Sequence, residues 1–292
     1  MQGIILRGIG SFYYALDDEG TVHTLRAQGK LRRERLKPKV GDRVELTPGN
    51  DEEHGWILSI LPRKNELVRP PVANIDVIAI VVAAATPDPD LMLTDRLMLN
   101  AKRAGIDVRL VINKCDLDPE NAAQIANQYR GAGVEPVMVS AGKKEGIEPL
   151  REILKGRVHA LAGQSGAGKS TLINALYGLN METGDLSRKI ERGKNTTRHC
   201  ELVPVEGGGM VLDTPGFSLL ETELFEPVEL KESWKEFQKY EGQCFFQPCY
   251  HATEPRCAVR DAVAEGEIDP ERHGRYVALL DEMKQRWRER YD

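Results

Sequence analysis

Residues 158–172 read VHALAGQSGAGKSTL, and no other stretch constrains the fold of this chain as strongly. The stretch holds the complete phosphate-loop pattern, in which a glycine is followed by four residues and then by Gly-Lys-Ser, from Gly163 to Ser170. Apolar residues before the loop predict a buried strand, and those after it predict a helix whose N-terminus faces bound phosphates. Because every fixed position is filled in that context, an accidental glycine-rich turn is a poor alternative, and we expect the chain to bind a nucleotide.

The residue types of this loop suit phosphate binding. Its glycines let backbone N–H groups point at phosphate oxygens in a conformation that a Cβ atom would obstruct. A lysine can place its charge between the β- and γ-phosphates, and a serine hydroxyl can bind Mg²⁺. We therefore expect Lys169 to be catalytic and Ser170 to bind magnesium, within a set of nucleotide contacts that comprises Gly163, Gln164, Ser165, Gly166, Ala167, Gly168, Lys169, Ser170 and Thr171.

The length and charge of the chain narrow the class of protein. Its 292 residues suggest two or three domains, and its formal net charge of −5 argues against a uniformly basic coat for nucleic acid. No apolar run is long enough to span a membrane, and the N-terminus MQGIILRGIGSF does not resemble a signal peptide. Five cysteines, an odd number, fit a reducing cytoplasm better than a disulfide framework. We expect a cytoplasmic protein of several domains that does not bind membranes.

Residues 1–70 read as short strands separated by turns, which predicts a small β-barrel of the OB-fold type. A basic stretch lies among these strands and is opposed only by Glu34; it comprises Arg26, Lys30, Arg32, Arg33, Arg35, Lys37 and Lys39. In an acidic protein this local excess favours contacts with RNA phosphates. A solvated basic loop without a partner remains the alternative.

Residues 71–222 alternate between strand and helix patterns. The run IDVIAIVVAA is continuously apolar, as a buried parallel strand should be, and amphipathic segments separate it from the strands that follow. This alternation predicts a doubly wound α/β domain. Ligands of such domains bind at the carboxyl ends of the strands, where the phosphate loop and the other motifs of this segment lie.

Two motifs in this domain suit a guanine base. Asn113, Lys114 and Asp116 form the pattern N-K-x-D at the end of a predicted strand. The carboxylate of Asp116 can accept hydrogen bonds from guanine N1–H and from the exocyclic amine, which adenine does not offer. Ser140 and Ala141 follow the next predicted strand, where guanine-nucleotide proteins place a backbone N–H against guanine O6. Either motif alone would be a weak signal, but together with the phosphate loop they predict a guanine pocket.

Two further segments suit the γ-phosphate and the metal. Asp213 begins the sequence Asp-Thr-Pro-Gly after an apolar strand, so it can hold Mg²⁺ through water while the Gly216 N–H senses the γ-phosphate. Residues 193–199 form a polar loop in which one threonine could reach Mg²⁺ and become ordered only when GTP is bound. Thr197 is slightly favoured for this role, although nothing in the sequence separates it from Thr196.

The order of these motifs is unusual. Most small GTPases carry the phosphate loop first and N-K-x-D late, whereas here N-K-x-D and Ser-Ala precede the phosphate loop, the threonine loop and Asp-x-x-Gly. This order predicts a circular permutation, which folded domains tolerate because their termini often lie close together. It also means that the Asp-x-x-Gly segment, which responds to loss of the γ-phosphate, leads directly into the C-terminal region.

Residues 223–292 contain a metal-ligand pattern. Three thiols and one imidazole, from Cys244, Cys249, His251 and Cys257, lie within fourteen residues. Four such ligands describe a closed tetrahedral Zn²⁺ site, and a catalytic zinc is less favoured because such sites keep an open position. Reduced cysteines packed as small hydrophobic residues are the alternative.

From residue 270 onward an apolar stripe predicts a helix that packs on the protein; it comprises Tyr276, Leu279, Leu280, Met283 and Trp287.

Taken together, the barrel, the permuted motifs, the Cys/His cluster and the helical tail resemble the circularly permuted GTPases that act on the bacterial small ribosomal subunit. The resemblance covers nearly the whole chain. It implies GTP hydrolysis stimulated by the 30S subunit, a role in late 30S maturation with release after hydrolysis, and contacts of the barrel and the zinc module with 16S rRNA. We expect the chain to act as a monomer with GTP or GDP, Mg²⁺ and one Zn²⁺.

The residues that would position the attacking water depart from common GTPase chemistry. Phe217 follows the Asp-x-x-Gly glycine, where Ras-like enzymes carry a water-orienting glutamine. Members of the resembled family share that change, and a histidine within the threonine loop is usually proposed instead, at the position of Asn195. Asparagine can orient water but cannot act as a base. Asn195 or His199 therefore remains a candidate catalytic residue, and we expect slow intrinsic turnover.

Two other functions fit part of the sequence. An RNA-binding assembly factor could use guanine nucleotide as a structural ligand with little turnover. A metabolic kinase could use the phosphate loop on a small acceptor, but N-K-x-D disfavours that reading.

Overall fold

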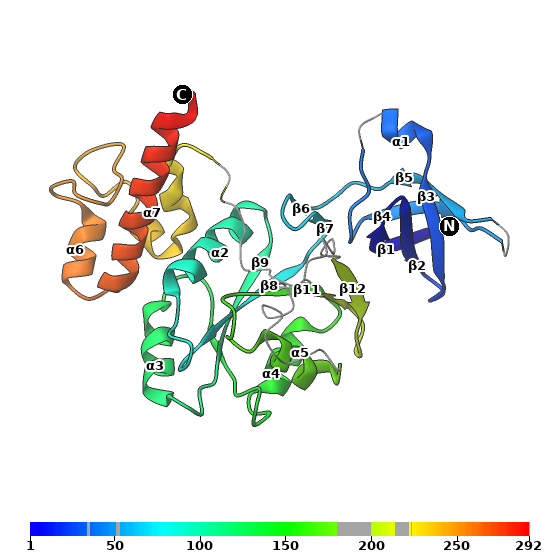
Figure 1. Cartoon of the computed structure of the whole chain (residues 1–292). Coiled ribbons are helices and arrows are strands. Elements are labelled where there is room, and N and C mark those ends of the chain that lie inside the picture. The colour runs from blue at the N-terminus through cyan, green and yellow to red at the C-terminus, as the bar shows by residue number, and fades with distance from the viewer. Residues whose placement is uncertain (34–35, 51–52, 180–199, 214–221, 223, 292) are drawn as a thin grey trace, which may run out of the picture.

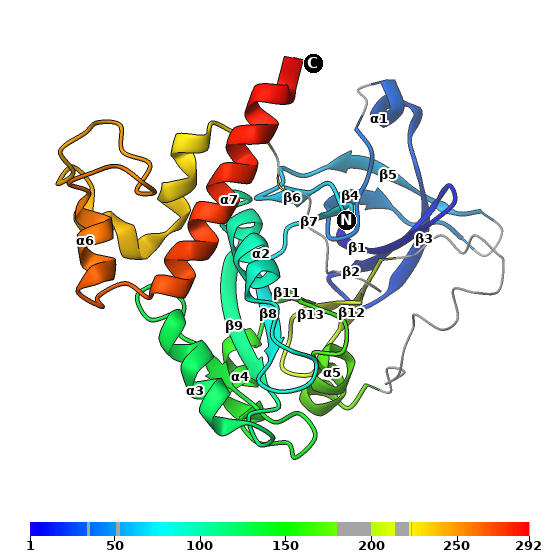
Figure 2. The ribbon, with the colours of Figure 1, turned by 60° about the vertical axis from the view of Figure 1, so that its left-hand side comes forward.

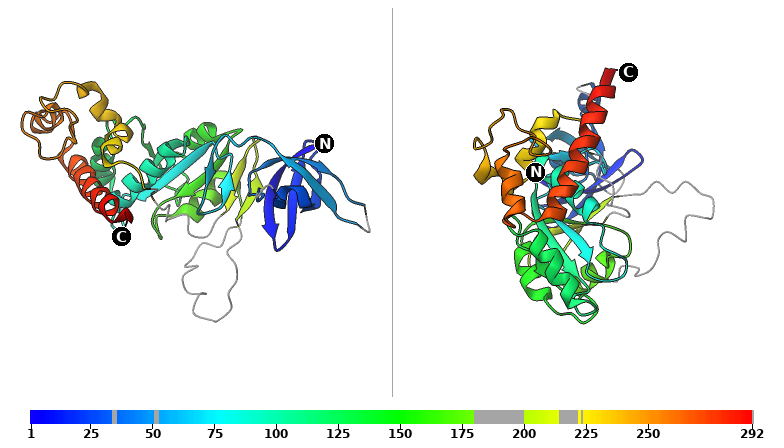
Figure 3. Two further views of the ribbon diagram at one scale, coloured as in Figure 1. Left: turned by 90° about the horizontal axis from the view of Figure 1, so that it is seen from above. Right: turned by 90° about the vertical axis from the view of Figure 1, so that its left-hand side faces the viewer.

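The computed structural model describes residues 1–33, 36–50, 53–179, 200–213, 222 and 224–291. Three parts follow one another in space as they do in the chain. Figure 3 shows the N-terminal barrel at one end, the nucleotide-motif domain in the middle and the C-terminal helices at the other end. This multidomain architecture matches the fold class expected from the sequence.

The N-terminal part is a closed barrel of five strands (Figure 1). The strands are β1 (Gln2–Ile9), β2 (Phe12–Asp17), β3 (Val22–Ala27), β4 (Arg43–Thr47) and β5 (Gly55–Ile60), and the short helix α1 (Gly29–Arg33) lies between β3 and β4. The order is β1-β2-β3-β5-β4, and pairing of β1 with β4 closes the barrel. Alternate residues fill the interior, namely Ile5, Ala15, Leu25, Val44, Leu46 and Ile57. The predicted OB-like barrel is confirmed.

The central sheet carries the nucleotide motifs. Its strands are β8 (Val77–Ala83), β9 (Asp107–Asn113), β10 (Val137–Met138), β11 (Val158–Ala162), β12 (Glu201–Pro204) and β13 (Met210–Asp213). The order β10-β9-β8-β11-β13 is parallel throughout, and β12 runs antiparallel to β13 at the side. Every residue of β8 is buried, as its continuous apolar sequence predicts.

Helices cover both faces of this sheet. The helices α2 (Leu91–Arg103) and α3 (Pro119–Gln128) pack on one face, and α4 (Ile147–Leu154) and α5 (Lys169–Tyr177) pack on the other. Aspartate side chains cap two of them, because Asp90 accepts a hydrogen bond from Leu93 N at 2.8 Å and Asp118 accepts one from Asn121 N at 2.9 Å. The doubly wound α/β arrangement predicted from the sequence is present.

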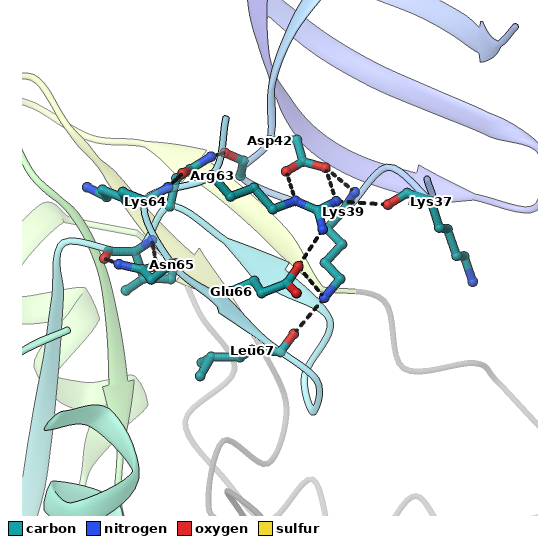
Figure 4. A network of polar contacts seen from close by, with 11 residues as sticks. Lys37, Lys39, Asp42, Arg63, Lys64, Asn65, Glu66 and Leu67 are labelled. Carbon is teal, nitrogen blue, oxygen red and sulfur yellow. Dashed lines mark hydrogen bonds and ion pairs between the residues drawn. The ribbon is translucent and has the colours of Figure 1, made fainter. Parts of the chain in front are cut away.

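A short segment, residues 61–76, joins the barrel to the central sheet through polar contacts (Figure 4). It contains the hairpin strands β6 (Glu66–Leu67) and β7 (Val72–Ala73). Arg63 reaches back to the fully buried Asp42 of the barrel with two hydrogen bonds, Nε to Oδ1 at 2.7 Å and Nη2 to Oδ2 at 2.8 Å. Asn74 donates to Gly41 O at 2.9 Å and accepts from Lys64 N at 2.9 Å. These hydrogen bonds join the barrel to the segment that leads into the central sheet.

The C-terminal part packs on α2. It comprises the 3₁₀ helices η2 (Pro227–Ser233), η3 (Lys235–Tyr240) and η4 (Glu289–Tyr291) and the helices α6 (Ala258–Ala264) and α7 (Pro270–Arg288). Tyr276, Leu279, Leu280 and Met283 of α7 are buried in a shared core that also includes Leu99 of α2. The predicted apolar stripe is thus confirmed, with Trp287 half-buried at its end.

A buried group of charges fixes this contact. Asp95 of α2 is 1% exposed and pairs with both Arg272 and Arg275 of α7, with 2.6 Å between Asp95 Oδ2 and Arg275 Nε. Arg272 also pairs with Glu236 and lies over the ring of Tyr129 at 4.7 Å. Buried charges are costly to leave unpaired, so these pairs favour one seating of α7 on α2.

Among the described residues, none of the helices has the length and apolar character needed to cross a membrane.

Candidate functional site

The phosphate loop follows β11 and ends where α5 begins at Lys169. At two positions of the loop, neighbouring atoms lie so close to the backbone that only glycine fits. Gly163 has φ of 132°, and a Cβ there would lie 2.1 Å from Val81 O. Gly168 has φ of 92°, and a Cβ there would lie 2.4 Å from Asn113 Nδ2. The loop is therefore packed tightly between β8 and the N-K-x-D segment, as only glycine permits.

Lys169 lies on its own loop. Its Nζ donates to Gly163 O at 2.7 Å and to Gln164 O at 2.8 Å. Burial lowers the pKa of this ammonium, because few water molecules reach it. The group is a compact positive charge aimed along the loop, and an anionic ligand at this position would compensate the charge that burial disfavours. Ser170 and Thr171 follow in the first turn of α5.

Asn113 binds two predicted motifs together. Its side chain is 2% exposed and donates to Ala167 O of the phosphate loop at 2.9 Å. Its Oδ1 accepts from Ala141 N at 3.0 Å, in the Ser-Ala segment. The phosphate loop, N-K-x-D and Ser-Ala therefore meet at one buried amide, although 54 residues separate Asn113 from Ala167. In this structure the Ala141 N–H faces that amide.

Asp116 lies beside the same segment. A hydrogen bond with Ser140 holds the pKa of its carboxyl below the usual value, and nearby Lys143 acts in the same direction, with 3.5 Å between Lys143 Nζ and Asp116 Oδ2. The carboxyl is thus kept ionised as a hydrogen-bond acceptor. Lys114, with φ of 63°, turns the chain between Asn113 and Asp116 and donates to Gly166 O at 2.8 Å.

Asp213 ends β13 at the same end of the sheet. Half-burial raises the pKa of its carboxyl, and the negative charge of Glu201, its cross-strand partner, raises it further. Burial and the nearby negative charge both disfavour the ionised form of Asp213. A cation such as Mg²⁺ beside the carboxylate would stabilise that ionised form. The predicted site residues Asn195, Thr196, Thr197, His199 and Gly216, together with Phe217, lie outside the described residues.

The sequence placed Gln164 among the nucleotide contacts of the phosphate loop but did not indicate the partners of its side chain. Its Oε1 accepts from Asp90 N at 2.7 Å, and its Nε2 donates to Asp88 O at 2.9 Å. These backbone groups belong to the turn after β8, whose sequence is Thr-Pro-Asp-Pro-Asp. That run was a turn signal, but no local pattern indicated that the turn packs against the phosphate loop.

The basic stretch of the barrel divides among several contacts. Arg26 lies over the ring of Phe12 at 4.5 Å, and Lys39 pairs with Glu66 at 3.0 Å in the joint (Figure 4). Arg33 and Lys37 are exposed, and Arg35 lies outside the described residues. Lys39 therefore contributes to the joint, and the exposed side chains of the stretch are the ones that an RNA could reach.

The Cys/His cluster forms a second site in the C-terminal part. The ligand atoms of Cys244, Cys249, His251 and Cys257 all lie within 4.8 Å of one another, and all four residues are buried. Both Cys244 Sγ and Cys249 Sγ are 3.8 Å from Cys257 Sγ, and His251 Nδ1 is 3.5 Å from Cys244 Sγ and from Cys257 Sγ. Metal–sulfur bonds of about 2.3 Å in a tetrahedron give edges close to these lengths, so the residues fit a closed tetrahedral metal site.

The surroundings of the cluster also suit a metal. His251 turns its Nε2 toward Glu241, with 3.5 Å to Oε2, as metal-bound imidazoles often face a carboxylate. Burial raises the pKa of the Cys249 thiol to about 12, and a metal would favour the thiolate instead. Cys115 donates to Ile112 O at 3.0 Å, and Cys200 lies half-buried with its pKa raised to about 11, so neither belongs to the cluster.

Comparison with known protein families agrees with this geometry. The family model described as RsgA GTPase matches residues 60–223, and the RsgA N-terminal domain model matches residues 2–57. A protein named small ribosomal subunit biogenesis GTPase RsgA, from Caldanaerobacter subterraneus subsp. tengcongensis, is 43% identical over 100% of this chain and 98% of its own length. A protein of the same name from Agathobacter rectalis is 40% identical over 98% of this chain and 99% of its own.

Solved structures share the whole architecture. The crystal structure of YjeQ from Thermotoga maritima has a TM-score of 0.83 at 36% identity, and covers 97% of this chain and 98% of its own. The structure of YloQ, described as a circularly permuted GTPase, has a TM-score of 0.79 at 32% identity, with 98% and 95% covered. The arrangement of the barrel, the permuted domain and the C-terminal part therefore matches a fold that is already known.

Proposed function

The chain belongs to the RsgA GTPase family and is therefore a GTP hydrolase, and we propose that it acts on the small ribosomal subunit during its late maturation. Relatives named for small-subunit biogenesis match the chain over nearly its full length. The observation that most supports a working guanine-nucleotide site is the buried amide of Asn113, which joins the phosphate loop to the base-recognition segments. The enzyme binds the 30S subunit in its GTP state and leaves after hydrolysis.

Asp116 selects the base. Its ionised carboxyl accepts from guanine N1–H and the exocyclic amine, with Ser140 and Lys143 holding it in the charged form. Asn113 and Lys114 keep this segment against the phosphate loop. In this structure Ser140 N donates to Glu145 O at 3.0 Å and Ala141 N donates to Asn113 Oδ1 at 3.0 Å, so the expected contact of this segment with guanine O6 requires one of these N–H groups to change partner.

We expect Asp116→Asn to weaken GTP binding by about a hundredfold and to reduce the preference for GTP over ATP, because the new amide NH₂ would face donors of guanine. Equilibrium titration with labelled GTP and ATP measures both quantities. Asp107→Asn, at the exposed start of β9, is the matched control and should bind both nucleotides as the unaltered protein does. An unchanged GTP-to-ATP ratio in Asp116→Asn would contradict this role for the carboxyl.

Hydrolysis proceeds by positioning and charge neutralisation. Lys169 and the loop N–H groups would hold the β- and γ-phosphates, while Ser170, Thr197 and Asp213 would hold Mg²⁺, which would supply positive charge beside the phosphates. Asn195 or His199 orients the attacking water, and the Gly216 N–H senses the γ-phosphate. Because neither Asn195 nor Phe217 can act as a base, intrinsic turnover is slow and the ribosomal subunit stimulates it.

The remaining parts of the chain provide the contacts with RNA. Residues 1–70 form the RNA-binding barrel, residues 71–222 the GTPase domain, and residues 223–292 the zinc-binding and helical domain. The cluster of Cys244, Cys249, His251 and Cys257 holds one structural Zn²⁺, whose fit rests on the tetrahedral edges described above. The barrel and the zinc domain contact 16S rRNA, and the protein works as a monomer in the cytoplasm.

The test is phosphate release from GTP with and without purified small subunits. We expect small subunits to raise the rate by at least about tenfold, as partner-stimulated GTPases do. Purified large subunits serve as the control and should leave the rate unchanged. Stoichiometric GTP binding without turnover, even with small subunits present, would instead favour an RNA-binding factor that uses guanine nucleotide as a structural ligand.

A further inference from the structure

The phosphate loop is braced from outside by the turn that precedes α2. Both ends of the Gln164 amide bond to the backbone of this turn, at Asp90 N and Asp88 O. Lys114 adds a contact to Thr86 O while also donating to Gly166 O. The turn is thus held by both the phosphate loop and the N-K-x-D segment, and Asp90 within it is the cap of α2.

Within the described part of the chain, the same helix makes several polar contacts with the C-terminal part. Figure 2 shows α7 crossing α2. Besides Asp95, three basic residues of α2 contact the C-terminal part. Arg96 pairs with Glu282, Lys102 Nζ donates to Ser233 O at 3.1 Å, and Arg103 lies 3.6 Å over the ring of Phe225. Helix α2 is therefore fastened to the phosphate loop at its first turn and to the C-terminal part along its length.

We propose that Gln164 is a positioning residue that transmits nucleotide occupancy from the phosphate loop through α2 to the C-terminal part. In the structure, Lys169 Nζ is bonded to the carbonyl of Gln164 at 2.8 Å. Phosphate oxygens compete for the same ammonium, so binding of nucleotide changes the contact that holds the Gln164 backbone. Its side chain is bonded to the turn that caps α2, and a 13-residue helix packed along one side moves as a unit.

This coupling rests on the proposed guanine-nucleotide site, and it implies that nucleotide affinity and the seating of α7 depend on each other. If nucleotide changes the seating of α7, then the seating of α7 must change nucleotide affinity by the same factor. Substitution of Gln164 can separate nucleotide binding from the seating of α7, because this side chain bonds to the turn before α2 and not to α7 itself.

The test combines nucleotide titration with hydrogen exchange on the full chain. In the unaltered protein, GDP should slow amide exchange in residues 163–177, in the first turns of α2 and in α7. In Gln164→Ala, we expect GDP affinity to fall by about tenfold. At saturating GDP the variant should keep protection in residues 163–177 and lose the nucleotide-dependent protection in α2 and α7.

Two further variants sharpen the result. Gln164→Glu keeps an acceptor for Asp90 N–H but opposes Asp88 O with a second acceptor, so it should lie between the unaltered protein and Gln164→Ala; it also decides the matter if the alanine variant fails to fold. Gln124→Ala, at an exposed glutamine of α3, is the control and should match the unaltered protein.

Retained protection of α7 in Gln164→Ala at saturating GDP would overturn the proposal. So would GDP binding that leaves α7 exchange unchanged in the unaltered protein, although the proposed function would then stand. Failure of the unaltered protein to bind guanine nucleotide would overturn both.

Discussion

Replacing Lys169 with alanine is expected to abolish nucleotide binding, with affinity for GDP and GTP reduced by more than about 1,000-fold, or ~4 kcal/mol. The lysine is the first residue of α5 and places its ammonium among loop carbonyls that lie beside the phosphate site. Removing it deletes charge-assisted bonds to two phosphates at a half-buried position.

The measurement is titration with a fluorescent guanine nucleotide, alongside thermal unfolding of the nucleotide-free protein. Burial lowers the pKa of Lys169, so its charge is a cost to the nucleotide-free fold, and we expect the variant to remain folded. Lys155→Ala is the matched control, because this exposed lysine pairs with Glu152 on the far end of α4. Binding by Lys169→Ala within tenfold of the control would contradict the assignment of the phosphate loop.

Removal of zinc is expected to unfold the C-terminal cluster. Three thiols and an imidazole are buried at tetrahedral spacing in a segment whose backbone is mostly loop. Structural zinc sites contribute roughly 10 kcal/mol to the folding of such segments. Without the metal, the buried thiols would have only one another and the imidazole as partners, so a strong chelator should release one zinc per chain and expose residues 241–264 to rapid hydrogen exchange.

Two cysteine variants make this test specific. Cys249→Ser should lose the bound zinc and reproduce the exchange pattern of the chelated protein. Cys200→Ser should keep one zinc per chain, because this residue lies outside the cluster. If the chelated protein kept slow exchange in residues 241–264, the cysteines would be packed as small hydrophobic residues and the zinc assignment would be wrong.

Much of the fold could be predicted because the patterns that carry it are local. The apolar run of β8, the amphipathic pattern of α2 and the glycine-rich loop before α5 can each be recognised within about a dozen residues of sequence. The metal cluster is equally local, since its four ligands fall within residues 244–257. Strand β10 is the weakest of these predictions, because only Val137–Met138 forms a ladder within a longer apolar run.

What the sequence did not reveal depends on long-range side-chain contacts. Asp42 and Arg63 read as ordinary surface residues, yet they form the joint between barrel and sheet. Asp95 sits within an amphipathic helix and pairs with arginines about 180 residues away. Gln164 occupies a variable position of the phosphate-loop pattern. No periodicity or spacing rule marks such residues, because their partners are chosen by the packing of whole elements.

The pairing of β1 with β12 has a consequence for association between chains. An unpaired strand at the side of a sheet presents free N–H and C=O groups, which invite edge-to-edge aggregation. Here the barrel strand covers the start of β12 through the pair Arg7 and Glu201, and Pro204 leaves its other end without an N–H. The opposite edge, β10, is only two residues long. The attachment of the barrel thus also protects the central sheet from recruiting a second copy of itself.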